Sequence, residues 1–123
     1  MDKTLAVGVG GFLGAAGRYG LGLLVYRVLP ATFPWATFLI NVTGCLAIGV
    51  LGALVERAAI GAAGRLFWIT GVLGGYTTFS TFGYESVALL QKGQPAAALG
   101  NVVGQVVLGL LAVWAGMALA RYL

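Results

Sequence analysis

The chain has 123 residues, of which 60% are hydrophobic and only 8% are charged, with no histidine and a single cysteine. Soluble domains carry about 25% charged residues, so a chain this apolar cannot cover itself with polar surface and belongs in a membrane. The net charge of +4 comes from scattered residues rather than a basic cluster, which argues against nucleic acid as a partner. Without histidine, neither a transition-metal site nor a Cys/His nucleophile pair can be assembled, and we expect no enzyme.

The apolar stretches predict an all-α membrane protein with one domain, residues 1–123, that crosses the bilayer four times, since each span needs about 20 residues. Pro30 and Pro34 bracket the first loop, and Pro95 opens the last helix, where its missing N–H costs nothing. The loops are short, so the helices form an antiparallel bundle. We place the four helices at about residues 4–26, 35–55, 66–90 and 96–120.

The first two predicted helices each carry one polar side chain that needs an explanation. Arg18 is the only charge well inside the first helix, and its side chain either snorkels to the nearer interface or binds an ion directly. Asn41 lies near the middle of the second helix. An amide at this depth must face protein or water, so Asn41 either links helices by hydrogen bonds or faces a permeating solute.

The third predicted helix contains the stretch GVLGGYTTFSTFGYE, residues 71–85. Gly74 and Gly75 weaken a helix by about 1 kcal/mol each relative to alanine, and the threonines that follow are good N-caps. We therefore predict a break near residues 74–77. Carbonyls freed at a break suit a cation, whereas the N-terminus of the following half-helix favours an anion.

After the break, helical spacing places Phe79 and Phe82 beside a face of hydroxyl groups. The edge of a phenyl ring carries partial positive charge. Ring edges, hydroxyls and the Asn41 amide together suit a small anion better than a cation. Glu85, about two turns past the break, either lines a wet vestibule or reaches the interface. The hydroxyl face consists of Thr77, Ser80, Thr81 and Tyr84.

Lysines and arginines divide almost equally between the two ends of the predicted bundle, four against three. Orientation in a membrane normally follows asymmetry in these charges. Two alternatives stay open: a few flanking charges decide the orientation, or the chain inserts both ways and pairs as an antiparallel dimer. Glycine and alanine at four-residue spacing, clearest in the fourth helix, predict tight packing within and between subunits: Ala96, Gly100, Gly104, Ala112, Gly116 and Ala120.

Three stretches resemble the Fluc/CrcB family of small bacterial fluoride channels: GGFLGAAGRY (10–19), ATFLINVTG (36–44) and GVLGGYTTFSTF (71–82). The resemblance implies a dual-topology antiparallel homodimer in the bacterial inner membrane that exports fluoride passively through two narrow pores. It places Arg18 and Glu85 near the vestibules. It implies a structural sodium ion at the dimer centre, held by the backbone carbonyls of Gly74 and Thr77 from both subunits. The fluoride contacts that it implies are Asn41, Phe79, Phe82, Ser80 and Thr81.

The fourth helix departs from the family pattern, because Asn101 and Gln105 stand where family members often place a tyrosine and a serine. Both amides can still form hydrogen bonds, so the polar track survives in altered form. The main alternative function is a small proton-coupled multidrug exporter of cationic compounds. Such exporters resemble one another in a membrane-embedded glutamate of the first helix, where this chain has only Arg18. A packing subunit of a larger complex would leave Asn41 unexplained.

Overall fold

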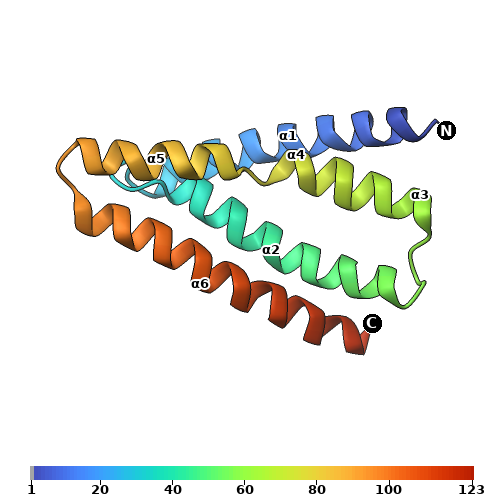
Figure 1. Ribbon diagram of the computed structural model, residues 1–123. Helices are drawn as coiled ribbons and strands as arrows, with labels where there is room; N and C mark the ends of the chain where they lie inside the picture. Colours follow the sequence, from blue (N-terminus) through green and yellow to red (C-terminus); the bar gives the residue numbers. More distant parts are fainter. Residues whose placement is uncertain (1) are drawn as a thin grey trace.

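The computed structural model describes residues 2–123, which form four antiparallel helical passes without β-strands (Figure 1). The first two passes are α1 (Lys3–Val28) and α2 (Trp35–Glu56). The third pass consists of α3 (Ala62–Arg65), η1 (Leu66–Leu73), α4 (Gly74–Tyr76) and α5 (Phe79–Gln91), and the fourth of α6 (Pro95–Leu119) and η2 (Ala120–Tyr122). The N- and C-termini lie at the same end of the molecule, as an even number of passes requires. The predicted four-helix, all-α architecture is confirmed.

Two of the helices are long and apolar enough to cross a membrane by length and composition. They are Trp35–Glu56, with a mean hydropathy of 2.2, and Pro95–Tyr122, with a mean hydropathy of 2.1. Pro95 is the first residue of α6, as predicted. The third pass differs from prediction at its start, since it begins at Ala62 and continues as η1, whose wider turns are π-helical.

Close backbone contacts at glycines hold the passes together in two pairs, α2 with α6 and α1 with η1 and α4. A Cβ atom added to Gly116 would lie 3.0 Å from the Val50 nitrogen of α2, and one added to Gly71 would lie 3.0 Å from the Cα atom of Gly10 in α1. Such contacts maximise dispersion between helices in lipid, where hydrophobic exclusion does not act between them. The predicted stripe on α6 is buried only toward its C-terminal end, because Ala96 and Gly100 are exposed.

The break in the third pass begins at the C-terminal end of the predicted range, residues 74–77. Gly74 has helical dihedral angles, φ −61° and ψ −36°, and belongs with Gly75 to α4. The chain becomes extended only at Thr77, with ψ 159°, and Thr78, with φ −152° and ψ 113°. Gly75 serves another purpose, since a Cβ there would overlap the carbonyl of Gly11 in α1. The glycine pair therefore lies just before the break and remains helical itself.

One end of the bundle is tied together by Arg57, the residue that follows α2. Its guanidinium donates a hydrogen bond to the carbonyl of Ala120, in the last turn of the fourth pass. Carbonyls in the last turn of a helix lack intrahelical donors, and a cation there also interacts favourably with the helix dipole. This contact joins the end of α2 to the end of the fourth pass.

Candidate functional site

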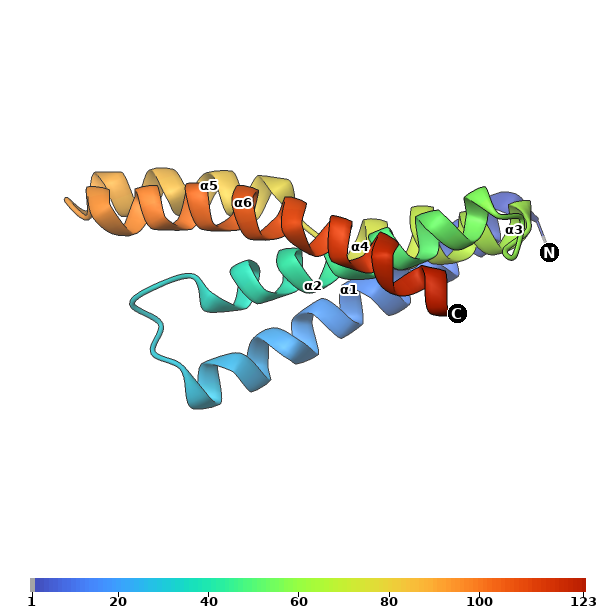
Figure 2. The ribbon, with the colours of Figure 1, turned by 90° about the horizontal axis from the view of Figure 1, so that it is seen from below.

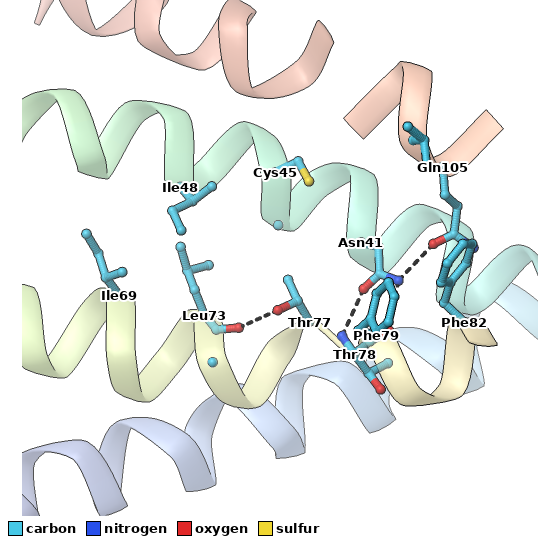
Figure 3. Close-up of a pocket in the computed structure, with 13 residues that line it drawn as sticks. Asn41, Cys45, Ile48, Ile69, Leu73, Thr77, Thr78, Phe79, Phe82 and Gln105 are labelled. Atoms are coloured by element: carbon cyan, nitrogen blue, oxygen red, sulfur yellow. Dashed lines mark hydrogen bonds between the residues drawn. The ribbon is translucent and has the colours of Figure 1, made fainter. Parts of the chain in front are cut away.

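The break is held open by the side chain of Asn41, which reaches it from α2. The Asn41 Oδ1 atom accepts a hydrogen bond from the Thr78 N–H at 2.9 Å, and Nδ2 donates to the Thr78 carbonyl at 3.0 Å (Figure 3). In a continuous α-helix the Thr78 N–H would bond to the carbonyl of Gly74. The amide of Asn41 thus replaces the helix as the partner of Thr78, which explains why the chain extends at this residue.

The break leaves the carbonyls of the turn before it without helical donors, and those of Gly74 and Thr77 are two of them. The Gly74 carbonyl loses the Thr78 N–H to Asn41, and the Thr77 carbonyl loses the Thr81 N–H, which bonds to Thr78 Oγ1 at 3.3 Å as the N-cap of α5. The hydroxyl of Thr77 donates to the carbonyl of Leu73 at 3.0 Å. Within residues 2–123 no group of three or more His, Cys, Asp or Glu side chains can hold a metal ion. The freed carbonyls are therefore the candidate cation ligands.

A chain of hydrogen bonds, which we call the amide relay, runs from Asn41 through Gln105 and Asn101 to Ser86. Asn41 Nδ2 donates to Gln105 Oε1 at 2.8 Å, and Gln105 Nε2 donates to Asn101 Oδ1 at 2.8 Å. Asn101 Nδ2 donates to Ser86 Oγ at 2.9 Å, and the Ser86 hydroxyl donates to the Phe82 carbonyl at 2.7 Å. Asn101 is fully buried. The two residues that depart from the family pattern thus link α6 to both α2 and α5.

A cavity of about 390 Å³ lies on one side of the break. Its polar lining comes from Asn41, Thr77, Thr78 and Gln105, and its remaining walls are mostly apolar (Figure 3). The rings of Phe79 and Phe82 also line it, and their centroids are 5.5 Å apart at an interplanar angle of 45°. Phe79 is 83% exposed, so this cavity opens to the outside of the single chain.

A second cavity, of about 680 Å³, lies on the other side of the break. It is bounded by α1 and α2, which diverge from each other toward their connecting loop (Figure 2). Arg18 and Arg27 line it from α1, Thr37 from α2, and Thr78 and Thr81 from the break and α5. The predicted hydroxyl face is thus divided, because Thr77 lines the first cavity and Thr81 the second, while Ser80 is exposed.

Glu85 points toward α2 rather than away from the bundle. Its Oε1 atom accepts a hydrogen bond from the Thr37 hydroxyl at 2.9 Å, and its Oε2 atom is buried without a hydrogen-bond partner among residues 2–123. Thr37 lines the second cavity. Arg18 thus lines this cavity, whereas Glu85 does not line it and is connected to it only through its hydrogen bond with Thr37.

Sequence reasoning missed two partners in this arrangement, Ser86 and the backbone of Thr78. Asn101 and Gln105 were noticed only as departures from a pattern. Their spacing of four residues on an apolar helix was the available signal, because it places both amides on one face. Nothing in the spacing of Ser86 or Asn41 indicated which helices would bring their side chains together.

Comparison with known proteins identifies the family of this chain. Residues 5–117 match the family model described as CrcB-like protein, Camphor Resistance (CrcB). A protein of Chloroflexus aurantiacus named fluoride-specific ion channel FluC is 46% identical over 123 residues, covering 99% of this chain and 98% of the relative. Proteins of the same name from Rhizobium meliloti and Thermus thermophilus are each 45% identical, covering 98% and 94% of this chain and 98% and 93% of the relatives. The chain therefore belongs to the CrcB-like family.

Proposed function

We propose that this chain is a fluoride-selective channel of the bacterial inner membrane, which lets fluoride leave the cell passively. The observation that carries the proposal is the near full-length similarity to relatives named fluoride-specific ion channels, in a chain whose interrupted helix is lined by uncharged hydrogen-bonding groups. Such groups can replace the water around a small anion without the cost of burying a fixed charge.

The physical benefit of such a channel follows from the chemistry of hydrogen fluoride. This weak acid crosses membranes in its neutral form, ionises in a near-neutral cytoplasm and is trapped there as the anion. A membrane potential that is negative inside drives an anion outward with about 2.3 kcal/mol per 100 mV. A passive and selective pore is therefore sufficient, and no coupled energy source is required.

Asn41, Phe79 and Phe82 are the proposed fluoride contacts in the first cavity, where their side chains converge. The ring edges of the two phenylalanines offer weak positive charge without a competing counter-ion. Ser80 and Thr81 continue the path as hydroxyl donors, and Arg18 and Glu85 lie at the vestibule. Arg18 attracts anions there, and Thr37 orients the carboxylate of Glu85 by its hydrogen bond.

We further propose that the working unit is an antiparallel homodimer with a sodium ion at its centre. Hard cations take several oxygen ligands, and the proposed ligands from one chain are two of its freed carbonyls, those of Gly74 and Thr77. A second antiparallel copy would supply the same two again. Gly74 is exposed in the single chain, which leaves room there for a second copy. A Cβ atom added to Gly74 would have the Ile69 carbonyl, at 3.9 Å, as its nearest neighbour. In this proposal the sodium ion is structural and takes no part in conduction.

We also propose dual topology, in which the chain inserts in both orientations. Its loops are short, so the balance of lysines and arginines at the two ends decides the orientation. Lys3, Arg65 and Arg121 lie toward the end that holds both termini, and Arg27 and Lys92 toward the other end. Arg57 adds a fourth basic group at the first end, and Arg18, within α1, adds a third toward the other. This near balance supports insertion in both orientations.

The deciding experiment is fluoride efflux from liposomes that contain the purified protein, followed with a fluoride electrode. Fluoride should leave when the membrane potential is dissipated by a potassium ionophore, and chloride should not. The exporter alternative instead requires an acid for proton coupling, and Glu85 is the only acid within the spans. Efflux of a cationic dye that depends on a proton gradient and disappears in Glu85→Gln would refute the channel.

A separate experiment checks the dual topology. A cysteine introduced near residue 60 should be labelled only in part from outside intact cells, because a single orientation gives complete or no labelling.

A further inference from the structure

The direction of the amide relay is set at the break. Asn41 cannot exchange its oxygen and nitrogen, because the Thr78 N–H only donates and the Thr78 carbonyl only accepts. Its second N–H therefore points to Gln105, which must present Oε1 to it. Gln105 and Asn101 then donate in turn away from the break, and the relay ends where the Ser86 hydroxyl donates to the Phe82 carbonyl.

The same heavy atoms allow a second arrangement with the opposite direction. Rotating the terminal amides of Gln105 and Asn101 by half a turn exchanges their oxygen and nitrogen atoms, and these torsions are broad and roughly two-fold. The Ser86 hydroxyl would then donate to Asn101 Oδ1, and Asn101 Nδ2 to Gln105 Oε1. Two bonds are given up, the one from Asn41 to Gln105 and the one from Ser86 to the Phe82 carbonyl. That carbonyl retains the backbone N–H of Ser86, four residues on in α5.

In the reversed arrangement two amide donors face the first cavity together. Gln105 Nε2 takes the position of Oε1, which lies 2.8 Å from Asn41 Nδ2, and both residues line that cavity. Two adjacent N–H groups without an acceptor are costly in a buried site, so this arrangement is unfavourable while the cavity holds no anion. An anion seated against both nitrogens supplies the missing acceptor.

We propose that Gln105 is a second amide donor to the permeating anion, presented by reversal of the amide relay. The inference rests on the proposed function and deepens it, because it names a binding group and the event that exposes it. In the resting arrangement the side-chain carbonyl of Gln105 accepts a hydrogen bond from Asn41, so that this donor has a partner. An arriving anion displaces this carbonyl and is then held by two donors. A cation gains nothing from the reversal, since it would face two N–H groups.

The first test observes the wild-type protein, and variants of the relay serve only to assign its signals. The side-chain NH₂ resonances of the wild-type protein, labelled with nitrogen-15 in micelles, are followed by NMR during titration with sodium fluoride. They are assigned from the signals lost in Gln105→Leu and Asn101→Leu. Both the Gln105 and the Asn101 signals should shift with the same midpoint as fluoride binding, and sodium chloride should move neither. Fluoride binding that shifts the Asn41 signal and leaves Gln105 and Asn101 unmoved would overturn the inference.

The second test uses Ser86→Ala. Reversal of the relay predicts that this loss of a hydroxyl strengthens fluoride binding. In the resting arrangement this change leaves a fully buried Asn101 N–H without an acceptor, whereas the reversed arrangement leaves only a carbonyl oxygen unpaired. Orphaned buried N–H groups are rarer than orphaned carbonyls, so the reversed arrangement gains. The fluoride concentration for half-saturation should fall by about fivefold, the factor that one net hydrogen bond contributes. Unchanged or weaker fluoride binding in Ser86→Ala would contradict the reversal.

Two further variants complete the comparison. Gln105→Leu removes the second donor and should raise the half-saturating concentration by about tenfold or more, as expected for a lost hydrogen bond to an ion. Thr43→Ala is the matched control, because the Thr43 hydroxyl also donates to a carbonyl four residues earlier, that of Leu39 at 2.7 Å, but lies outside the relay. It should leave fluoride binding unchanged. Wild-type liposomes without fluoride flux would refute the proposed function itself, whereas flux with an unmoved Gln105 signal refutes only the relay.

Discussion

Two neighbouring glycines in α4 offer a sharp test of how the third pass is held. A Cβ atom added to Gly75 would overlap the Gly11 carbonyl and lie 3.1 Å from the Ala15 nitrogen, both in the backbone of α1. A Cβ atom added to Gly74 would meet only the Ile69 carbonyl, at 3.9 Å. Gly75→Ala therefore forces α1 away from the third pass, while Gly74→Ala fits the single chain without any movement.

The two substitutions should change the free energy of unfolding in opposite directions. Overpacking costs typically about 1–3 kcal/mol, and the upper end applies to Gly75 because the obstructing atoms belong to the backbone and cannot rotate away. Alanine gains about 1 kcal/mol over glycine within a helix. Gly75→Ala should therefore destabilise the chain by about 2 kcal/mol, while Gly74→Ala should stabilise it by about 1 kcal/mol. The two variants should differ by about 3 kcal/mol.

The measurement is unfolding of each variant by dodecyl sulfate in mixed micelles, followed by circular dichroism at protein concentrations low enough to give separate chains. Equal stability of Gly75→Ala and the wild type would refute the idea that glycine is needed for the approach of α1. The same variants test the proposed dimer. If a second copy packs at Gly74, Gly74→Ala should dissociate the dimer and abolish fluoride efflux although the single chain is more stable than before.

Three other substitutions probe the break and the first cavity. Asn41→Asp turns the hydrogen bond to the Thr78 carbonyl, at 3.0 Å, into a contact between two oxygens; it should abolish fluoride efflux and lower stability by about 2 kcal/mol. Phe79→Ile keeps bulk but removes the ring edge, so efflux should fall steeply while the dimer fraction in size-exclusion chromatography stays unchanged. Thr78→Val removes the N-cap of α5 and should cost about 1 kcal/mol in chemical unfolding, whereas Thr78→Ser should retain most of that stability.

Much of the architecture could be predicted from the sequence because it depends on short-range physical chemistry. Apolar stretches of sufficient length become helices in a membrane, since backbone groups there must be satisfied within the segment. Prolines mark where helices begin, and Pro95 is indeed the first residue of α6. Asn41 was noticed for the same reason, because an amide in an apolar setting requires partners, whereas Asn101 and Gln105 were noticed only as departures from the family pattern.

The position of the break and the identity of those partners were decided by the tertiary structure. Glycine weakens a helix locally, yet Gly74 and Gly75 both remain helical, and Gly75 lets α1 approach. Thr78 leaves the helix because Asn41, 37 residues away in the sequence, offers its backbone both an acceptor and a donor. A helix opens where a side chain from another segment satisfies its backbone better than the next turn does, and sequence spacing carries no record of which segment that is.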